Sequence, residues 1–399
     1  MEKFLKFLLF LFVSSLIFGQ LTKVEFGSPP VVFYLHDFIL AGLIFSSIIY
    51  FFAYKGRFVL PKGSVLILIF ILIGAISQLN SARFFDLSQV AVGSLFLIRF
   101  AAFFLIFPIF VNLVKWQQLK FWSNLIIFVG VILAILGFFQ LIFFNNLSFL
   151  QVAGFDPHIG RLVSTFLDPN FFGGFQVLIL NLTLAQLFET KDKKLIFASF
   201  FLFFSIVLTF SRSSYLALFV SILLFGALKS KRAAIAIFGA FILLIPAIPR
   251  IVERILGAIT FDITASARIV SWLEAIKIFF LSPLIGVGFN NLRFAKANLG
   301  FFEISQRLGG HSGAGVDSSF LLVLATTGIF GILAFLSFYF FLIYKNLSAR
   351  TNFYSLAAAI SLIALLFHSQ FVNSFFFPWI AGLFWLKIAM SDVAELSKK

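Results

Sequence analysis

Long apolar runs, separated by short polar loops, make up almost the whole chain of 399 residues. A helix that spans a bilayer needs roughly 20 apolar residues, and about twelve runs come close to this length. They lie at 4–21, 31–53, 64–80, 88–113, 121–144, 170–189, 195–211, 213–228, 233–249, 318–344, 353–372 and 375–390. The pattern predicts an all-α polytopic membrane protein with about 12 transmembrane helices. No small-x-small cleavage motif follows Phe18, so the first run is expected to stay as a helix.

One long stretch, 249–318, interrupts this pattern. It is rich in charged residues, which are costly inside a bilayer. The chain is therefore expected to have three parts: transmembrane helices 1–9 at 1–249, a loop domain at 250–317, and transmembrane helices 10–12 at 318–399.

Composition supports the same class of protein. Apolar residues make up 61% of the chain and charged residues 11%, whereas soluble domains carry about 25% charged residues. A net charge of +15 would suggest nucleic-acid binding in a soluble protein, but here cationic loops explain it better, and no nucleic acid is expected. The chain has no cysteine, which excludes disulfides and thiolate metal sites. No glycine-rich nucleotide loop is present, so no cofactor is expected.

Lysine and arginine are distributed unevenly between alternate loops. Most lie in the short loops on one side, while the other side has few besides those of the long loop. Since cations are retained on cytoplasmic loops, both termini are expected in the cytoplasm and the 250–317 loop outside. All four histidines (His36, His158, His311 and His368) then lie at or near the outer face. Any chemistry is expected there.

Two short loops on this outer side carry an arginine among small polar residues. Arg161 precedes Asp168-Pro169-Asn170, a turn in which Asn170 can cap the next helix. Arg212 lies between two apolar segments in Thr209-Phe-Ser-Arg-Ser-Ser-Tyr215. Either arginine can bind a phosphate through two N–H groups, with the serine hydroxyls near Arg212 as further donors. The alternatives are a capped re-entrant loop and a side chain that extends to the interface.

The long loop contains one amphipathic pattern. Ile269, Trp272, Ile276 and Phe279 recur at helical spacing before Ser282-Pro283, which predicts a short helix along the membrane surface. Arg268 is four residues before Trp272 and shares its face. That face would bring the guanidinium near lipid phosphates. A salt bridge to Glu274 is the alternative, at a spacing that suits a helix poorly.

The loop ends with two ionisable groups before an apolar run. His311 and Asp317 are separated by a Gly/Ser-rich segment. Either can act as a general base on a hydroxyl. Asp317 can instead cap the following helix, and His311 can be simply solvated.

Four blocks in this order resemble the O-antigen ligase and O-antigen polymerase superfamily. They are Arg161…Thr165-Phe…Asp168-Pro169-Asn170, Ser211-Arg212-Ser213, Arg268…Trp272…Pro283-Leu-Ile-Gly286-Val-Gly288, and Asp317-Ser-Ser-Phe-Leu…Thr327-Gly328-Ile-Phe-Gly331. The similarity covers about 155–345. Ligases typically open the last block with His-Asn, where this chain has Asp317-Ser318 and a histidine six residues earlier. Asp317 is favoured over His311 as the base.

The resemblance implies a membrane glycosyltransferase of the cell envelope. Such an enzyme transfers a glycan from a polyprenyl diphosphate to a hydroxyl of a glycan, glycolipid or protein acceptor, without a metal, at the outer face of the cytoplasmic (inner) membrane. Its diphosphate-binding arginines correspond to Arg212, Arg268 and Arg161. Growing charge on the leaving diphosphate is stabilised by fixed guanidinium groups.

Two other classes remain possible on the sequence. A transporter or flippase of lipid-linked sugars would also be helical, but it usually carries charges or broken helices at the midplane, where only Arg99 qualifies. A structural scaffold would not need so many ionisable groups in one loop. The best metal ligands, Asp156, His158 and Asp168, are loosely spaced, so we expect no metal site and transfer activity that survives EDTA.

Overall fold

The computed structural model describes residues 1–27, 31–55, 57–247, 249–260, 262–301 and 315–397. It is 79% helical with almost no sheet. The helices are α1 (Glu2–Ser15), α2 (Leu35–Tyr50), α3 (Ser64–Asn80), α4 (Leu87–Leu113), α5 (Leu119–Phe143), α6 (Pro169–Thr190), α7 (Lys193–Val207), α8 (Arg212–Leu228), α9 (Lys231–Ala247), α10 (Pro249–Ile259), α11 (Ile263–Phe279), α12 (Leu292–Asn298), α14 (Ser319–Ser348), α15 (Phe353–His368) and α16 (Pro378–Leu396).

Every predicted apolar segment contains one of these helices. Within the described residues, seven helices are long and apolar enough to span a membrane: α1 to α6 and α14, some of them extended by a 3₁₀ or π turn. α8 and α15 are shorter apolar helices. The class of helical membrane protein is therefore confirmed, while the number of about 12 crossings stays a prediction.

The second predicted segment begins too early. Residues 31–33 form a strand, β2 (Val31–Phe33), which pairs antiparallel with β1 (Val24–Phe26). The β-branched Val31 and Val32 suit this extended pairing. The helix α2 starts only at Leu35, where Asp37 accepts a hydrogen bond from the backbone of Tyr34.

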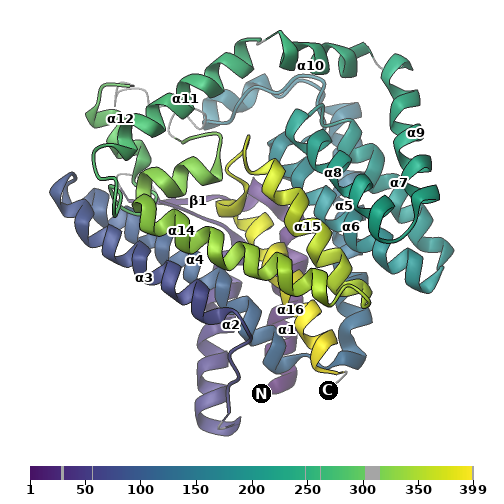
Figure 1. The fold of residues 1–399 in the computed structure, drawn as a ribbon, viewed down its shortest axis with the longest axis horizontal. Coiled ribbons are helices and arrows are strands. Elements are labelled where there is room, and N and C mark those ends of the chain that lie inside the picture. Colours follow the sequence, from purple (N-terminus) through teal and green to yellow (C-terminus); the bar gives the residue numbers. More distant parts are fainter. Residues whose placement is uncertain (28–30, 56, 248, 261, 302–314, 398–399) are drawn as a thin grey trace.

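The helix α6 occupies the interior of the bundle. It packs against α5, α7, α8, α15 and α16, and most of its side chains are buried. Its first turn therefore lies in a fixed position at the end of the bundle where α8 also begins. Both chain termini lie at the lower edge of Figure 1, and α10 and α11 lie at the upper edge.

The long loop holds more structure than the single helix expected from the sequence. Three helices, α10, α11 and α12, lie in its described part. α11 begins after Asp262, whose side chain accepts a hydrogen bond from Ala265 N, and it ends at Phe279, close to the predicted Ser282-Pro283. Ile278 and Phe294 belong to a small apolar cluster that also includes Leu322 of α14. The loop is thus packed onto the bundle.

A break in α14 ties this loop to the bundle backbone. Gly328 has a φ of +65° and interrupts the helix, and Gly286 has a φ of +74°. The two segments exchange backbone hydrogen bonds, including Gly288 N to Thr326 O (3.1 Å) and Ile329 N to Pro283 O (2.8 Å). A Cβ on Gly286 would overlap the Thr326 backbone, and one on Gly328 would overlap the Leu284 backbone. Glycine is required at both positions because of φ and close approach.

Candidate functional site

An arginine cluster gathers around the backbone turn at the start of α8. Arg161 donates from Nε to Thr209 O (2.9 Å) and from Nη2 to Phe210 O (3.3 Å). Arg254 of α10 donates from Nε to the same Phe210 carbonyl (3.1 Å). Phe210 has a φ of +50°, so this carbonyl belongs to a sharp turn. The turn therefore joins two arginines that are far apart in sequence.

Arg250 completes this part of the cluster. Its guanidinium donates to Gly160 O (2.6 Å) and Ile159 O (2.7 Å) and lies 4.9 Å from the centre of the Phe210 ring. Neither Arg250 nor Arg254 is recognisable as a site residue from the sequence alone. The two residues are four positions apart and therefore share one face of α10. This spacing indicates a shared face only where the segment is known to be helical.

Arg212, at the first position of α8, is held almost completely by protein groups. Two of its hydrogen bonds go to the Asp262 carboxylate, one to Arg254 O and one to Thr264 Oγ1 (3.4 Å). These use four of the five N–H groups of the guanidinium. Arg212 therefore fixes α10 and α11 relative to α8.

The serine hydroxyls beside Arg212 do not serve as the free donors that the sequence suggested. Ser211, Ser213 and Ser214 are buried. Ser211 caps α8 by accepting from Ser214 N (3.4 Å) and donates to Asn170 Oδ1 (2.8 Å). The fold uses these hydroxyls to join the starts of α6 and α8, so that expectation is wrong.

Arg268 and Asp317 form an ion pair at the other edge of the cluster. Arg268 Nε lies 3.3 Å from Asp317 Oδ2. Trp272, on the same face of α11, donates from Nε1 to the backbone carbonyl of Asp317 (3.2 Å). This face of α11 contacts the segment before α14. Ile269 and Ile276, which belong to the same predicted face, are each 38% exposed, so the position of α11 along the membrane surface stays a prediction.

The capping roles also differ from those expected. Ser318, not Asp317, caps α14, since its side chain accepts from Leu321 N (3.3 Å). Asp168, not Asn170, caps α6, with Oδ1 accepting from Asn170 N (2.7 Å) and Phe171 N (3.0 Å). Asp317 is therefore free of a capping role. His311 lies outside the described residues.

The cluster is strongly cationic. Within the described residues, Arg161, Arg250 and Arg254 have no carboxylate within 4.0 Å, whereas Arg212 pairs with Asp262 and Arg268 with Asp317. Burial and the neighbouring Arg254 lower the pKa of Arg161 to about 9, which leaves it charged at neutral pH. Burial, Arg212, Arg250 and Arg268 also lower the pKa of Arg254. Such mutual repulsion suits a site that receives an anion.

Opposing effects act on the pKa of the Asp317 carboxyl. Desolvation by the surrounding protein raises its pKa, and Asp168 and Asp156 add to this rise, while Arg268 opposes it. Its side chain is 54% exposed. A carboxylate that is accessible and more basic than usual can accept a proton.

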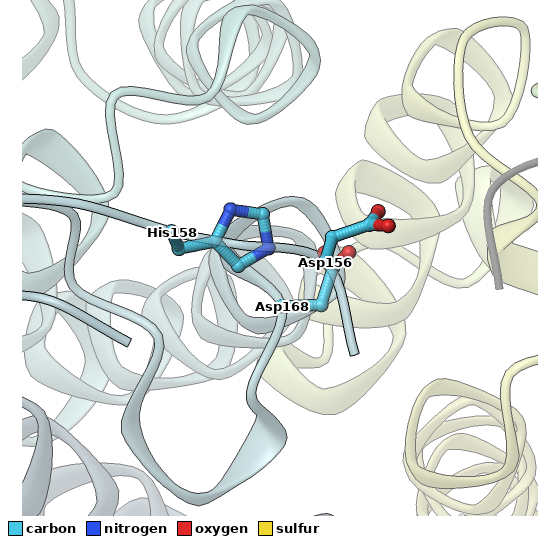
Figure 2. Close-up of side chains that lie close together, drawn as sticks. All are labelled: Asp156, His158 and Asp168. Atoms are coloured by element: carbon cyan, nitrogen blue, oxygen red, sulfur yellow. The ribbon is translucent and has the colours of Figure 1, made fainter. Parts of the chain in front are cut away.

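A second group lies next to the first turn of α6. Asp156, His158 and Asp168 place their ligand atoms within 4.8 Å of one another (Figure 2). The prediction of a metal-free site depends on the loose spacing of these residues in the sequence. Because the fold brings the three side chains together, their spacing no longer speaks against a metal site.

Fold and cluster together define a polytopic membrane protein whose long polar loop brings arginines to one end of the helix bundle. Residues 197–336 match the family model described as O-antigen ligase, which confirms the resemblance to the O-antigen ligase and polymerase superfamily over this segment. A search of curated proteins found no match. The matched segment includes Arg212, Arg254, Arg268 and Asp317, whereas Arg161 and Asp168 precede it. The match supports an enzyme of ligase or polymerase type in general.

Proposed function

We propose that this protein transfers a glycan from a polyprenyl diphosphate to an acceptor hydroxyl. The observation that supports this most strongly is the gathering of Arg161, Arg212, Arg250 and Arg254 around the start of α8, together with the pairing of Arg268 with Asp317; four of these five arginines lie within the O-antigen ligase segment. An anionic diphosphate matches the excess positive charge, and the apolar bundle suits a polyprenyl chain.

The arginines have different roles in this proposal. Arg268 uses one N–H group and Arg254 one within the described residues, and Arg161 uses two. Their remaining N–H groups are available for phosphate oxygens. Arg212 has one N–H group left and acts mainly by holding Arg254 and Asp262 in place. It adds charge to the cluster from that fixed position.

The chemical step is a displacement at the anomeric carbon of the donor. The acceptor oxygen forms a bond to this carbon while the bond to the diphosphate oxygen breaks, and the electron pair leaves with the diphosphate. The arginines stabilise that growing charge. Asp317 takes the proton of the acceptor hydroxyl. A role for His311 as helper or substitute base remains part of the proposal on sequence grounds.

The reaction is proposed to occur at the extracytoplasmic face of the cytoplasmic membrane. Two observations support this: cations concentrate in the loops on the opposite side, as the positive-inside rule requires of cytoplasmic loops, and the termini lie at the opposite edge of Figure 1 from α10 and α11. The proposed acceptor is a glycan, a glycolipid or a protein.

The test is transfer by purified protein reconstituted in liposomes with a polyprenyl-diphosphate oligosaccharide and a candidate acceptor. A new glycosidic product is expected from the wild type, and much less from Asp317→Asn. A matched control is Asp86→Asn, because Asp86 begins α4 and forms no ion pair with the arginines of the cluster, and asparagine can cap the helix as aspartate does. Movement of the intact donor across the bilayer without product would instead indicate a transporter.

A further inference from the structure

The loop before α6 folds back on itself and brings together residues that are separated in sequence. Leu147 N donates to His158 O (3.0 Å), and Gly160 N donates to Asn145 O (2.6 Å). This pairing fixes the backbone on both sides of His158. As a result, the side chains of Asp156 and His158 meet Asp168 at the start of α6.

The His158 side chain has an unsatisfied buried nitrogen. Only 9% of the residue is exposed, and its Nε2 atom is buried without a hydrogen-bond partner among the described residues. Figure 2 shows one ring nitrogen facing the two carboxylates. A buried polar atom without a partner is destabilising, and a ligand bound at this position would satisfy it.

Neither carboxylate forms an ion pair with a described residue. Asp168 uses Oδ1 to cap α6, which leaves Oδ2 for another contact. Within the described residues, neither Asp156 nor Asp168 has a lysine or arginine nitrogen within 4.0 Å, since the nearby arginines pair with Asp262 and Asp317 or with carbonyls. Among the described residues, no hydrogen bond or ion pair joins these two carboxylates and the imidazole to one another, although their ligand atoms lie within 4.8 Å.

We propose that Asp156, His158 and Asp168 form a binding site for a divalent cation. Two carboxylate oxygens and one imidazole nitrogen suit a first-row ion such as Mn²⁺. A cation also accounts for Nε2 of His158, which is buried without a hydrogen-bond partner among the described residues.

The position of the site suggests its role. The charges of Arg161 and Arg268 lower the pKa of Asp168, and the charges of Asp156 and Asp168 raise the pKa of Asp317. The group therefore lies within electrostatic range of the arginines and of the proposed base. A bound cation would cancel the carboxylate charge that otherwise repels an arriving diphosphate. This role rests on the proposed transfer reaction, whereas the binding of the cation does not.

The experiment measures binding of Mn²⁺ to the purified full-length protein after treatment with a chelator. Free Mn²⁺ is followed by electron paramagnetic resonance during a titration, and the melting temperature is recorded with and without Mn²⁺. We expect one saturable site and a rise in melting temperature. His158→Gln and Asp156→Asn should each weaken binding at least 10-fold. Neither residue caps a helix, so these variants should fold.

Glu253→Gln is the matched control, because Glu253 is an exposed carboxylate of α10, and it should bind Mn²⁺ like the wild type. Absence of saturable binding by the wild type would overturn the proposal. Equal binding by the wild type and both ligand variants would overturn it as well. A protein that binds Mn²⁺ through these residues but forms no glycosidic product would refute the proposed function and leave the cation site standing.

Discussion

Replacing Arg268 tests the proposed reaction most directly. This side chain is largely buried, with 19% of its surface exposed, and its Nε holds Asp317. The other guanidinium hydrogens have no partner among the described residues. Arg268→Ala should therefore remove both a fixed charge at the leaving diphosphate and the partner that orients the proposed base.

The size of the effect follows from the position of this charge. Two unit charges 4 Å apart interact by about 4 kcal/mol at an effective dielectric constant of about 20, which suits a site near a protein surface. Loss of one preorganised contact of this kind typically lowers turnover roughly 10²–10³-fold. Arg268→Lys keeps the charge but loses the planar two-point geometry, so it should still lose roughly 10-fold or more.

The pH dependence separates the two roles of Arg268. Asp317 must be ionised to accept a proton, so kcat/KM should fall as the pH drops through its pKa. Desolvation, Asp168 and Asp156 raise that pKa, and Arg268 lowers it. Arg268→Ala should thus move the acidic limb of the profile to higher pH, in addition to reducing the plateau. A loss of fold alone would not shift the limb.

The assay is product formation in liposomes at varied donor concentration and pH, with folding checked by the melting temperature. Arg350→Ala is the matched control, since Arg350 follows the end of α14 and its exposed side chain donates a hydrogen bond to Leu347 O. If Arg268→Ala keeps kcat/KM within threefold of the wild type, then the guanidinium does not stabilise the leaving group. An unshifted acidic limb would rule out Asp317 as the group that titrates.

Three further predictions concern stability and orientation. The Arg212 guanidinium holds the pKa of Asp262 well below its ordinary value of 3.8, so the ion pair stabilises the fold above pH 3.8 and loses this effect as the pH falls further. Asp262→Asn should therefore cost at most about 1 kcal/mol of stability at neutral pH. Below about pH 4, the melting temperature of the variant should approach that of the wild type. Gly328→Ala forces a left-handed conformation and a backbone overlap and should cost roughly 2–5 kcal/mol, whereas Gly42→Ala, with open space around it, should leave the melting temperature unchanged or raise it. In this cysteine-free chain, an impermeant maleimide applied from outside the membrane should label Thr260→Cys and spare Thr351→Cys, and the opposite result would place the arginine cluster in the cytoplasm.

The sequence predicts the helices well but not the contacts between them. Apolar runs of bilayer length form helices in almost any context, so every predicted segment contains one. The strand at Val31–Phe33 was missed because a β-branched apolar run reads as part of the adjoining helix. The number of crossings depends on how short helices such as α7 and α9 sit in the bilayer, which a hydropathy pattern does not determine.

In the candidate site, too, some residues could be predicted from the sequence and others could not. Arg161 and Arg212 are recognisable because charge is rare between their apolar segments, and Arg268 because it shares a helix face with Trp272. Arg254 was missed because its role depends on a carbonyl at Phe210, in a turn with a positive φ. No local pattern predicts such a contact.

Two details of the site depend on geometry that the sequence does not show: which residue caps a helix, and which residues become neighbours when a loop folds back. Ser318 rather than Asp317 reaches the free N–H groups of α14. His158 and Asp168 are ten residues apart in sequence, yet they become neighbours through the pairing of 145–147 with 158–160.

The glycine interlock between 283–288 and 325–330 has a consequence for biosynthesis. Helix α11 emerges from the ribosome well before Gly328, so the backbone hydrogen bonds between 283–288 and α14 form only after α14 has also been made and inserted. Asp317 also follows Arg268 in the chain, and their ion pair therefore forms late in synthesis. A truncated chain that ends before Asp317 can still join Arg161, Arg212 and Arg254 at the start of α8, but it lacks the proposed base. The proposed transfer activity should therefore be absent from such a chain.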